Sequence, residues 1–242
     1  VEGLSATRRQ ALFTSLTGVQ HFPDRFTQIR RTGRLRVGTT GDYAPFSARD
    51  DRGLTGIDIT MAHDLAAALG VDLVLVDTSW PSLIADLDAG LWDIGMSGIS
   101  KDIGRGLHGF FSRSYYSTGK TPIAKCSAAG RLASMAQIDL PGVRVVVNPG
   151  GTNHRFAIDN LTRATVVVHP DNNTIFDEII DGRADVMITD AIEVALKVQQ
   201  HPDLCPTMPG KYLTQLEKAY LMPADIRLKE FVNNWLSLRL LD

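Results

Sequence analysis

The sequence has few cysteines, little excess charge and no long apolar run. Its 242 residues include two cysteines, Cys126 and Cys205, which lie far apart and in no metal-like spacing. They are either two buried thiols or a disulfide between distant segments, which would imply an oxidising compartment. The six histidines are scattered without the paired spacing of a metal site, so the sequence predicts no metal.

Positive and negative side chains nearly balance, with 25 Lys and Arg against 27 Asp and Glu. Such a balance argues against nucleic acid or an acidic membrane as the main partner. No segment approaches the roughly 20 consecutive apolar residues that a membrane span needs, so we expect no membrane insertion. The sequence contains no nucleophile elbow, Walker loop or dinucleotide fingerprint, and we expect no cofactor.

Residues 1–25 precede the regular pattern and are expected to form a helical extension or a linker. The segment Thr7–Arg9 faintly resembles a twin-arginine export signal, but the apolar stretch after it is short and is interrupted by Gly18. We interpret this stretch as an amphipathic helix with Leu12 and Phe13 on its apolar side, and no signal peptide is visible.

From Arg34 onward, short apolar strands alternate with helices. Strands are expected at Leu35–Thr40, Val71–Val76, Asp93–Met96, Val143–Val147, Thr165–Val168 and Ala184–Ile188. This alternation predicts an α/β architecture with largely parallel sheets. The polar stretch Ser127–Gln137 separates two such series, so we expect two lobes. A late strand at Lys218–Met222 and a helix over Leu228–Leu238 are expected to return to the first lobe.

The segment Val145–Asn153 predicts a buried strand, a glycine turn and the start of a helix. The first N–H groups of a helix lack intrahelical partners, so such a junction can cradle an anion. The alternative is a simple strand-to-helix turn that Thr152 or Asn153 caps.

Polar residues follow the other predicted strands as well. Open α/β sheets bind ligands beyond the carboxyl ends of their strands, so these residues are candidates for one site. They are Thr40, Asp42, Trp80, Ser97, Gly98, Ser100, Arg105, Lys120, Thr152, Asn153, Thr189, Asp190 and Glu193. Because cations, hydroxyls, amides and carboxylates meet there, we expect a small anionic ligand, such as a dicarboxylate or an amino acid.

Each candidate also has a structural interpretation. Arg105 and Lys120 are then solvated cations, and Trp80 is a core or rim aromatic. Asp190 is then the cap of a helix that starts at Ala191, and Glu193 completes a capping box with it.

The sequence resembles a known family over about Phe26 to Leu236. Generic segments resemble periplasmic type 2 solute-binding proteins for amino acids: Arg36–Phe46, Gly56–Asp58, Asp93–Met96, Ser100 with Arg105, and Asp185–Asp190. More distinctive segments resemble the periplasmic cyclohexadienyl dehydratases, which make phenylpyruvate from prephenate and phenylalanine from arogenate. These segments are Thr78–Pro81, Gly119–Ile123, Asn148–Asn153, His169–Asn172 and Thr189–Glu193.

The resemblance implies a type 2 periplasmic binding protein-like α/β fold with a ligand cleft between two lobes joined by two crossing segments. We expect lobe 1 over 26–126, lobe 2 over 127–205 and a return to lobe 1 over 206–242. Cys126 and Cys205 fall near the expected crossings, so the resemblance implies a disulfide that ties the hinge in a periplasmic or secreted protein. Residues 1–25 are either a linker or the end of a preceding domain, such as a fused chorismate mutase. The sequence predicts no particular oligomeric state.

The resemblance also assigns roles. Glu193 is the expected general acid for a dehydration coupled to decarboxylation, and it needs burial or a neighbouring carboxylate such as Asp190 to stay protonated. Lys120 is the second expected catalytic residue, and it is expected to orient the substrate, prephenate or arogenate, near the departing group. The expected substrate-binding residues are Asp42, Trp80, Ser97, Gly98, Ser100, Arg105, Thr152, Asn153 and Asp190. The alternative is a non-catalytic amino-acid-binding protein for transport or sensing, in which Asp190 binds an α-ammonium group.

Overall fold

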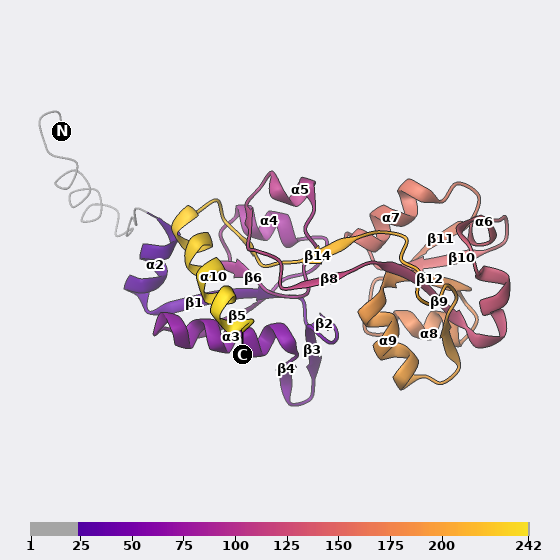
Figure 1. Ribbon diagram of the computed structural model, residues 1–242, viewed down its shortest axis with the longest axis horizontal. Helices are drawn as coiled ribbons and strands as arrows, with labels where there is room; N and C mark the ends of the chain where they lie inside the picture. The colour runs from indigo at the N-terminus through magenta and orange to yellow at the C-terminus, as the bar shows by residue number, and fades with distance from the viewer. Residues whose placement is uncertain (1–23, 242) are drawn as a thin grey trace, which may run out of the picture.

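The computed structural model describes residues 24–241, which form two α/β lobes side by side (Figure 1). Each lobe is built on its own five-stranded sheet. This is the two-lobed α/β architecture that the alternation of strands and helices predicted. The export-signal-like segment Thr7–Arg9 and the amphipathic helix after it lie outside the described residues.

The first lobe is built on a sheet in the order β5-β1-β6-β15-β7. Its strands are β1 (Arg34–Thr39), β5 (Asp72–Asp77), β6 (Ile94–Gly95), β7 (Phe110–Phe111) and β15 (Leu221–Met222). β5 and β6 pair with β1 in parallel, whereas β15 runs antiparallel to β6 and β7. The carboxyl ends of the parallel strands therefore meet at one edge, which is where an open sheet binds its ligand.

Helices of the first lobe bury its sheet. They are α2 (Arg25–Thr32), α3 (Ile57–Leu69), α4 (Leu83–Asp88), α5 (Ile103–Gly106) and α10 (Ile226–Arg239). α3 ends at Gly70 in the left-handed conformation (φ 65°), as a glycine cap allows. Val232 of α10 packs with Leu35 of β1 and Leu65 of α3, so the late segment of the chain completes the first core.

The second lobe is built on a sheet in the order β11-β10-β12-β9-β13. Its strands are β9 (Lys120–Lys125), β10 (Arg144–Val147), β11 (Thr165–Val168), β12 (Val186–Asp190) and β13 (Leu204–Pro206). β10 pairs in parallel with β11 and β12, and β9 runs antiparallel to both β12 and β13. The helices of this lobe are α6 (Met135–Ile138), α7 (Thr152–Asn160), α8 (Ile175–Ile180) and α9 (Ala191–Gln200), with a 3₁₀ turn over Cys126–Leu132.

Two antiparallel strands, β8 (Tyr116–Thr118) and β14 (Leu216–Lys218), join the lobes (Figure 1). The chain enters the second sheet directly after β8, because β9 already pairs with β12. The expectation of crossings near Cys126 and Cys205 is therefore wrong. We propose lobe boundaries at β8 and β14 instead.

Cys126 and Cys205 form a disulfide. Cys126 directly follows β9, and Cys205 lies in β13, the strand that pairs with β9. The bridge therefore lies within the second lobe and does not tie the hinge.

A small antiparallel sheet carries Tyr43, which faces the second lobe. It consists of β2 (Asp42–Tyr43), β3 (Ser47–Asp50) and β4 (Gly53–Thr55).

Among residues 24–241, no helix combines the length and apolar character that a membrane span requires. In the same range, no group of three or more His, Cys, Asp or Glu side chains is arranged to hold a metal ion.

Candidate active site

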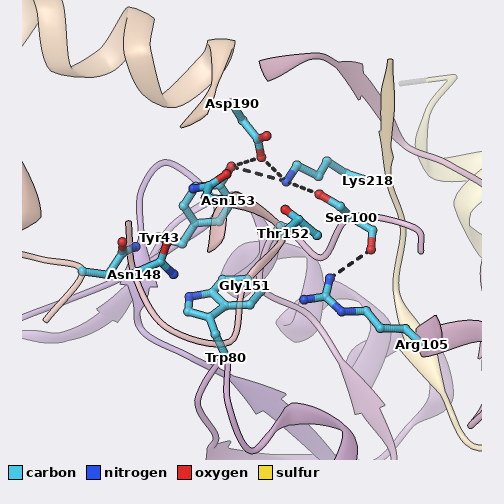
Figure 2. Close-up of a pocket in the computed structure, with 12 residues that line it drawn as sticks. Tyr43, Trp80, Ser100, Arg105, Asn148, Gly151, Thr152, Asn153, Asp190 and Lys218 are labelled. Atoms are coloured by element: carbon cyan, nitrogen blue, oxygen red, sulfur yellow. Dashed lines mark hydrogen bonds and ion pairs between the residues drawn. The ribbon is translucent and has the colours of Figure 1, made fainter. Parts of the chain in front are cut away.

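A small cavity lies between the lobes. Both lobes and the hinge strand β14 contribute to its wall (Figure 2). The lining residues are Tyr43, Trp80, Gly98, Ser100, Arg105, Asn148, Gly151, Thr152, Asn153, Asn172, Asp190 and Lys218. The convergence of polar residues that was predicted from the strand ends is therefore present. Most of the lining side chains are polar.

The turn between β10 and α7 forms the wall of the second lobe. The valines of β10 are fully buried, and α7 starts at Thr152 after Gly151, which makes no side-chain cap. Because no side chain caps this helix, its first N–H groups can donate to an anion in the cavity. Gly150 has a φ of 74°, and a β-carbon there would lie 2.6 Å from the Cα of Pro81 in the first lobe.

Arg105 supplies a buried cation from the first lobe. It lies in α5, where Asp102 caps the helix, and its residue exposure is only 5%. Its Nη1 donates to the carbonyl oxygen of Ser100 at 3.0 Å, and its guanidinium lies 5.8 Å from the Trp80 ring centroid. Burial lowers the pKa of Arg105 to about 10, so it keeps its charge at neutral pH. The interpretation of Arg105 as a solvated cation is wrong.

Asp190 is the centre of an ion-pair network. Its Oδ2 accepts from Lys218 Nζ at 2.6 Å and from the Tyr43 hydroxyl at 2.5 Å (Figure 2). Its Oδ1 lies 3.3 Å from Lys120 Nζ. Burial acts to raise the pKa of Asp190, but the charges of Lys218 and Lys120 outweigh burial and hold the pKa well below its ordinary value.

The Asp190 side chain does not cap α9, although Asp190 stands at the cap position. The capping interpretation is therefore wrong for this side chain. Burial raises the pKa of Tyr43 well above 10.0, so the phenol stays protonated. Its hydroxyl donates a hydrogen bond to Asp190.

Lys120, at the start of β9, is 2% exposed and stands behind the cavity wall. Its Nζ donates to Thr152 Oγ1 at 3.1 Å and to the side-chain oxygen of Asn153. Burial lowers the pKa of Lys120. The interpretation of Lys120 as a solvated cation is therefore also wrong. Its ammonium group holds the side chains of Thr152 and Asn153, which line the cavity.

Glu193, in the first turn of α9, is 3% exposed. The Thr189 hydroxyl donates to Glu193 Oε2 at 2.5 Å and accepts from Asn153 Nδ2 at 2.9 Å, so the carboxyl is linked to a residue of the cavity wall. Burial, together with the nearby charge of Asp190, raises the pKa of Glu193 to about 7. This environment is the one that a general acid needs at neutral pH.

The expected substrate-binding residues divide into two groups. Trp80, Gly98, Ser100, Arg105, Thr152, Asn153 and Asp190 line the cavity. Two expected residues do not line it. The Ser97 hydroxyl is occupied by the backbone N–H and hydroxyl of Thr40, and the Asp42 carboxylate accepts from Trp80 Nε1 at 3.1 Å. These two residues support the wall instead of forming it.

Five lining residues were not predicted: Tyr43, Asn148, Gly151, Asn172 and Lys218. Asn148 and Asn172 are 5% and 7% exposed, and the Oδ1 of each lacks a hydrogen-bond partner. Asn172 Nδ2 already donates to the Asp42 carbonyl at 2.8 Å, so its Oδ1 is left to accept. Two buried acceptors at one cavity indicate a ligand that carries a donor, such as a hydroxyl group.

The model for bacterial extracellular solute-binding proteins, family 3, matches residues 35–237. The chain belongs to this family. Relatives of the chain include a cyclohexadienyl dehydratase and a probable amino-acid transporter-binding protein, so the family decides the architecture and leaves the chemistry to the site.

Individual relatives narrow the range of activities that the chain resembles. The cyclohexadienyl dehydratase of Pseudomonas aeruginosa is 50% identical over 213 residues, which cover 88% of this chain and 80% of that protein. An ancestral amino acid-binding protein, AncCDT-1, described as a precursor of cyclohexadienyl dehydratase, superimposes with a TM-score of 0.82 at 33% identity and covers 89% of this chain and 92% of its own. A variant of an ancestral cyclohexadienyl dehydratase, AncCDT-3, has a TM-score of 0.54 at 43% identity over 90% and 92% of the two chains.

Proposed function

We propose that the protein is a cyclohexadienyl dehydratase that converts prephenate to phenylpyruvate and arogenate to phenylalanine. One observation carries this proposal: Glu193 is a buried carboxyl with a pKa of about 7, and it is linked through Thr189 to the wall of a cavity rich in cations. The identity to the Pseudomonas aeruginosa dehydratase supports the same activity. The family of extracellular binding proteins supports a periplasmic location.

The cavity offers groups for each part of prephenate. Arg105 and the N–H groups at the start of α7 are suited to its two carboxylates, and Lys218 adds positive charge beside them. The unpartnered oxygens of Asn148 and Asn172 are suited to accept from its ring hydroxyl. Lys120 orients the substrate indirectly, because it holds Thr152 and Asn153 in place.

The reaction needs one proton. The bond between the ring carbon and the hydroxyl oxygen breaks as that oxygen takes up the proton that Glu193 supplies from behind the cavity wall, and water leaves. The bond between the ring and its carboxylate breaks at the same time, its electron pair enters the ring, and carbon dioxide leaves. Hydroxide is a poor leaving group, so a positioned acid contributes about 10²–10⁴-fold. Glu193 then regains its proton from solvent.

The test is a turnover assay of Glu193→Gln with prephenate, read as phenylpyruvate absorbance in alkali. We expect kcat to fall by about 10²–10⁴-fold with little change in KM, because the amide keeps the shape and the Thr189 hydrogen bond but cannot supply a proton. Glu230→Gln is a matched control, because the Glu230 side chain is 57% exposed on α10. A variant that loses affinity at unchanged kcat would contradict the assignment of Glu193.

The competing function is reception of an amino acid without catalysis. Melting curves of the wild-type protein with common amino acids test it, because a ligand that binds only the folded state raises its stability. Stabilisation by an amino acid, with no turnover of prephenate or arogenate, would overturn the enzyme proposal.

A further inference from the structure

The carboxylate of Asp190 is already neutralised by the protein. Lys218 and Lys120 each place an ammonium group on one of its oxygens, at 2.6 and 3.3 Å, and Tyr43 adds a hydroxyl donor. Asp190 is 3% exposed, so little water screens these charges. A ligand ammonium group that approached this carboxylate would meet two lysines beside a single negative charge, and like charges repel strongly where water is excluded.

Lys218 is the nearer of the two cations, and it lines the cavity itself. It is the last residue of the hinge strand β14 and is 1% exposed. Its Nζ also donates to Ser100 Oγ at 2.9 Å and lies 4.8 Å from the Tyr43 ring centroid (Figure 2). These contacts hold the ammonium group between Asp190 of the second lobe and Ser100 of the first.

The charges of the site leave a positive excess. Lys120, Lys218 and Arg105 are cations, and Asp190 is the carboxylate paired with two of them. Among the lining residues the cations are Arg105 and Lys218, and the carboxylate is Asp190, which is already paired. A ligand ammonium group therefore meets no lining carboxylate without a cation on it, whereas a 2-oxo group brings no added charge.

We propose that Lys218 is a specificity-determining residue: by occupying Asp190, it makes the cleft select 2-oxo dicarboxylates over their 2-amino counterparts. This inference rests on the proposed dehydratase function and goes beyond it, because it predicts that prephenate is preferred to arogenate and names the residue responsible. Without Lys218, Asp190 keeps only Lys120 and the Tyr43 hydroxyl as partners, so its Oδ2 gains room to accept from an ammonium group.

The experiment measures kcat/KM for prephenate and for arogenate in the wild type, Lys218→Met and Lys218→Arg. The wild type should prefer prephenate. Lys218→Met should shift the ratio toward arogenate by about 10-fold or more, whereas Lys218→Arg keeps the charge and should preserve the preference. Lys229→Met is the matched control, because Lys229 lies on α10 beside Glu230, away from the cavity.

A wild type that prefers arogenate would overturn the inference, as would a Lys218→Met variant that loses both activities in parallel. Titration calorimetry of the wild type with phenylpyruvate and with phenylalanine gives a reading that does not depend on the folding of any variant. We expect phenylpyruvate to bind more tightly, and equal or reversed affinities would contradict the inference. A wild type that turns over neither substrate contradicts the dehydratase proposal instead, so the two failures are distinguishable.

Discussion

Glu193 is held in a position that favours its uncharged form. The carboxyl is fully buried, its one side-chain hydrogen bond comes from Thr189, and its acidic neighbour Asp190 remains ionised. The two carboxyls therefore have pKa values displaced in opposite directions, one by burial and the other by two lysines. These opposite displacements of the two pKa values make Glu193 the proton donor and Asp190 the fixed negative charge.

The pKa of Glu193 predicts how activity and stability depend on pH. Its ordinary value is 4.5 and its folded value is about 7, so between these values the folded protein keeps a proton that the unfolded chain releases. The free energy of unfolding therefore falls as pH rises through this window, and the full cost above it is on the order of 3 kcal/mol. Turnover of prephenate should decline above about pH 7, where the acid loses its proton.

Urea unfolding of the wild type and Glu193→Gln at about pH 5 and about pH 9 measures this effect. Glutamine cannot ionise, so the variant should gain stability relative to the wild type at the higher pH. A constant difference between the two proteins would show that Glu193 titrates normally in the folded state.

The prediction of individual site residues succeeded where a strand end could be located from the sequence. Asp190 and Arg105 follow apolar runs whose ends are clear, and both line the cavity. Lys218 was missed because the late strand was expected to start at this residue, whereas β14 ends there. Asn148 and Asn172 lie in turns whose side-chain directions depend on the fold.

At the scale of elements, the turn between β10 and α7 packs closely against the first lobe. Gly150 faces Pro81 across the cleft, so any added β-carbon there must push the lobes apart. The sequence predicted this strand, turn and helix, because a valine run followed by two glycines is a local signal. The hinge was placed wrongly, because the pairing of β9 with β12 is long-range and leaves no local signal.

Gly150→Ala should impair closure of the cleft. Its β-carbon would meet the Pro81 backbone at 2.6 Å, so we expect KM for prephenate to rise by about 10-fold or more. Gly142→Ala is a close control, because Gly142 also has a positive φ (87°) but no atom within 4 Å of an added β-carbon. Both variants share the backbone strain, and only the first obstructs the cleft. Equal KM values in the two variants would contradict this role of Gly150.

At the scale of the whole molecule, direct contacts between side chains and backbone bridge the lobes. Arg155 of α7 pairs with Asp102 at 2.6 Å, and Asn172 donates to the Asp42 carbonyl at 2.8 Å. The ion pair is partly exposed and so contributes only about 0–1 kcal/mol, less at high salt. The buried hydrogen bond from the Tyr43 hydroxyl to Asp190 at 2.5 Å and the ion pair of Lys218 with Asp190 add to these bridges, so several direct contacts hold the closed arrangement. The disulfide plays no part in it, since both cysteines lie in the second lobe.

Because the disulfide lies within the second lobe, we expect its removal to lower the stability of the protein but not its activity. The bridge joins residues 79 positions apart, and loss of such a loop constraint lowers the free energy of unfolding by about 4 kcal/mol in the chain-entropy account. The double variant Cys126→Ser, Cys205→Ser should therefore unfold at lower urea concentration. Its kcat/KM for prephenate should match the wild type below its melting temperature, because neither the hinge strands nor the cavity contain a cysteine. A large loss of kcat/KM in the folded variant would instead show that the second lobe transmits the bridge's constraint to the turn at Gly150 and the start of α7.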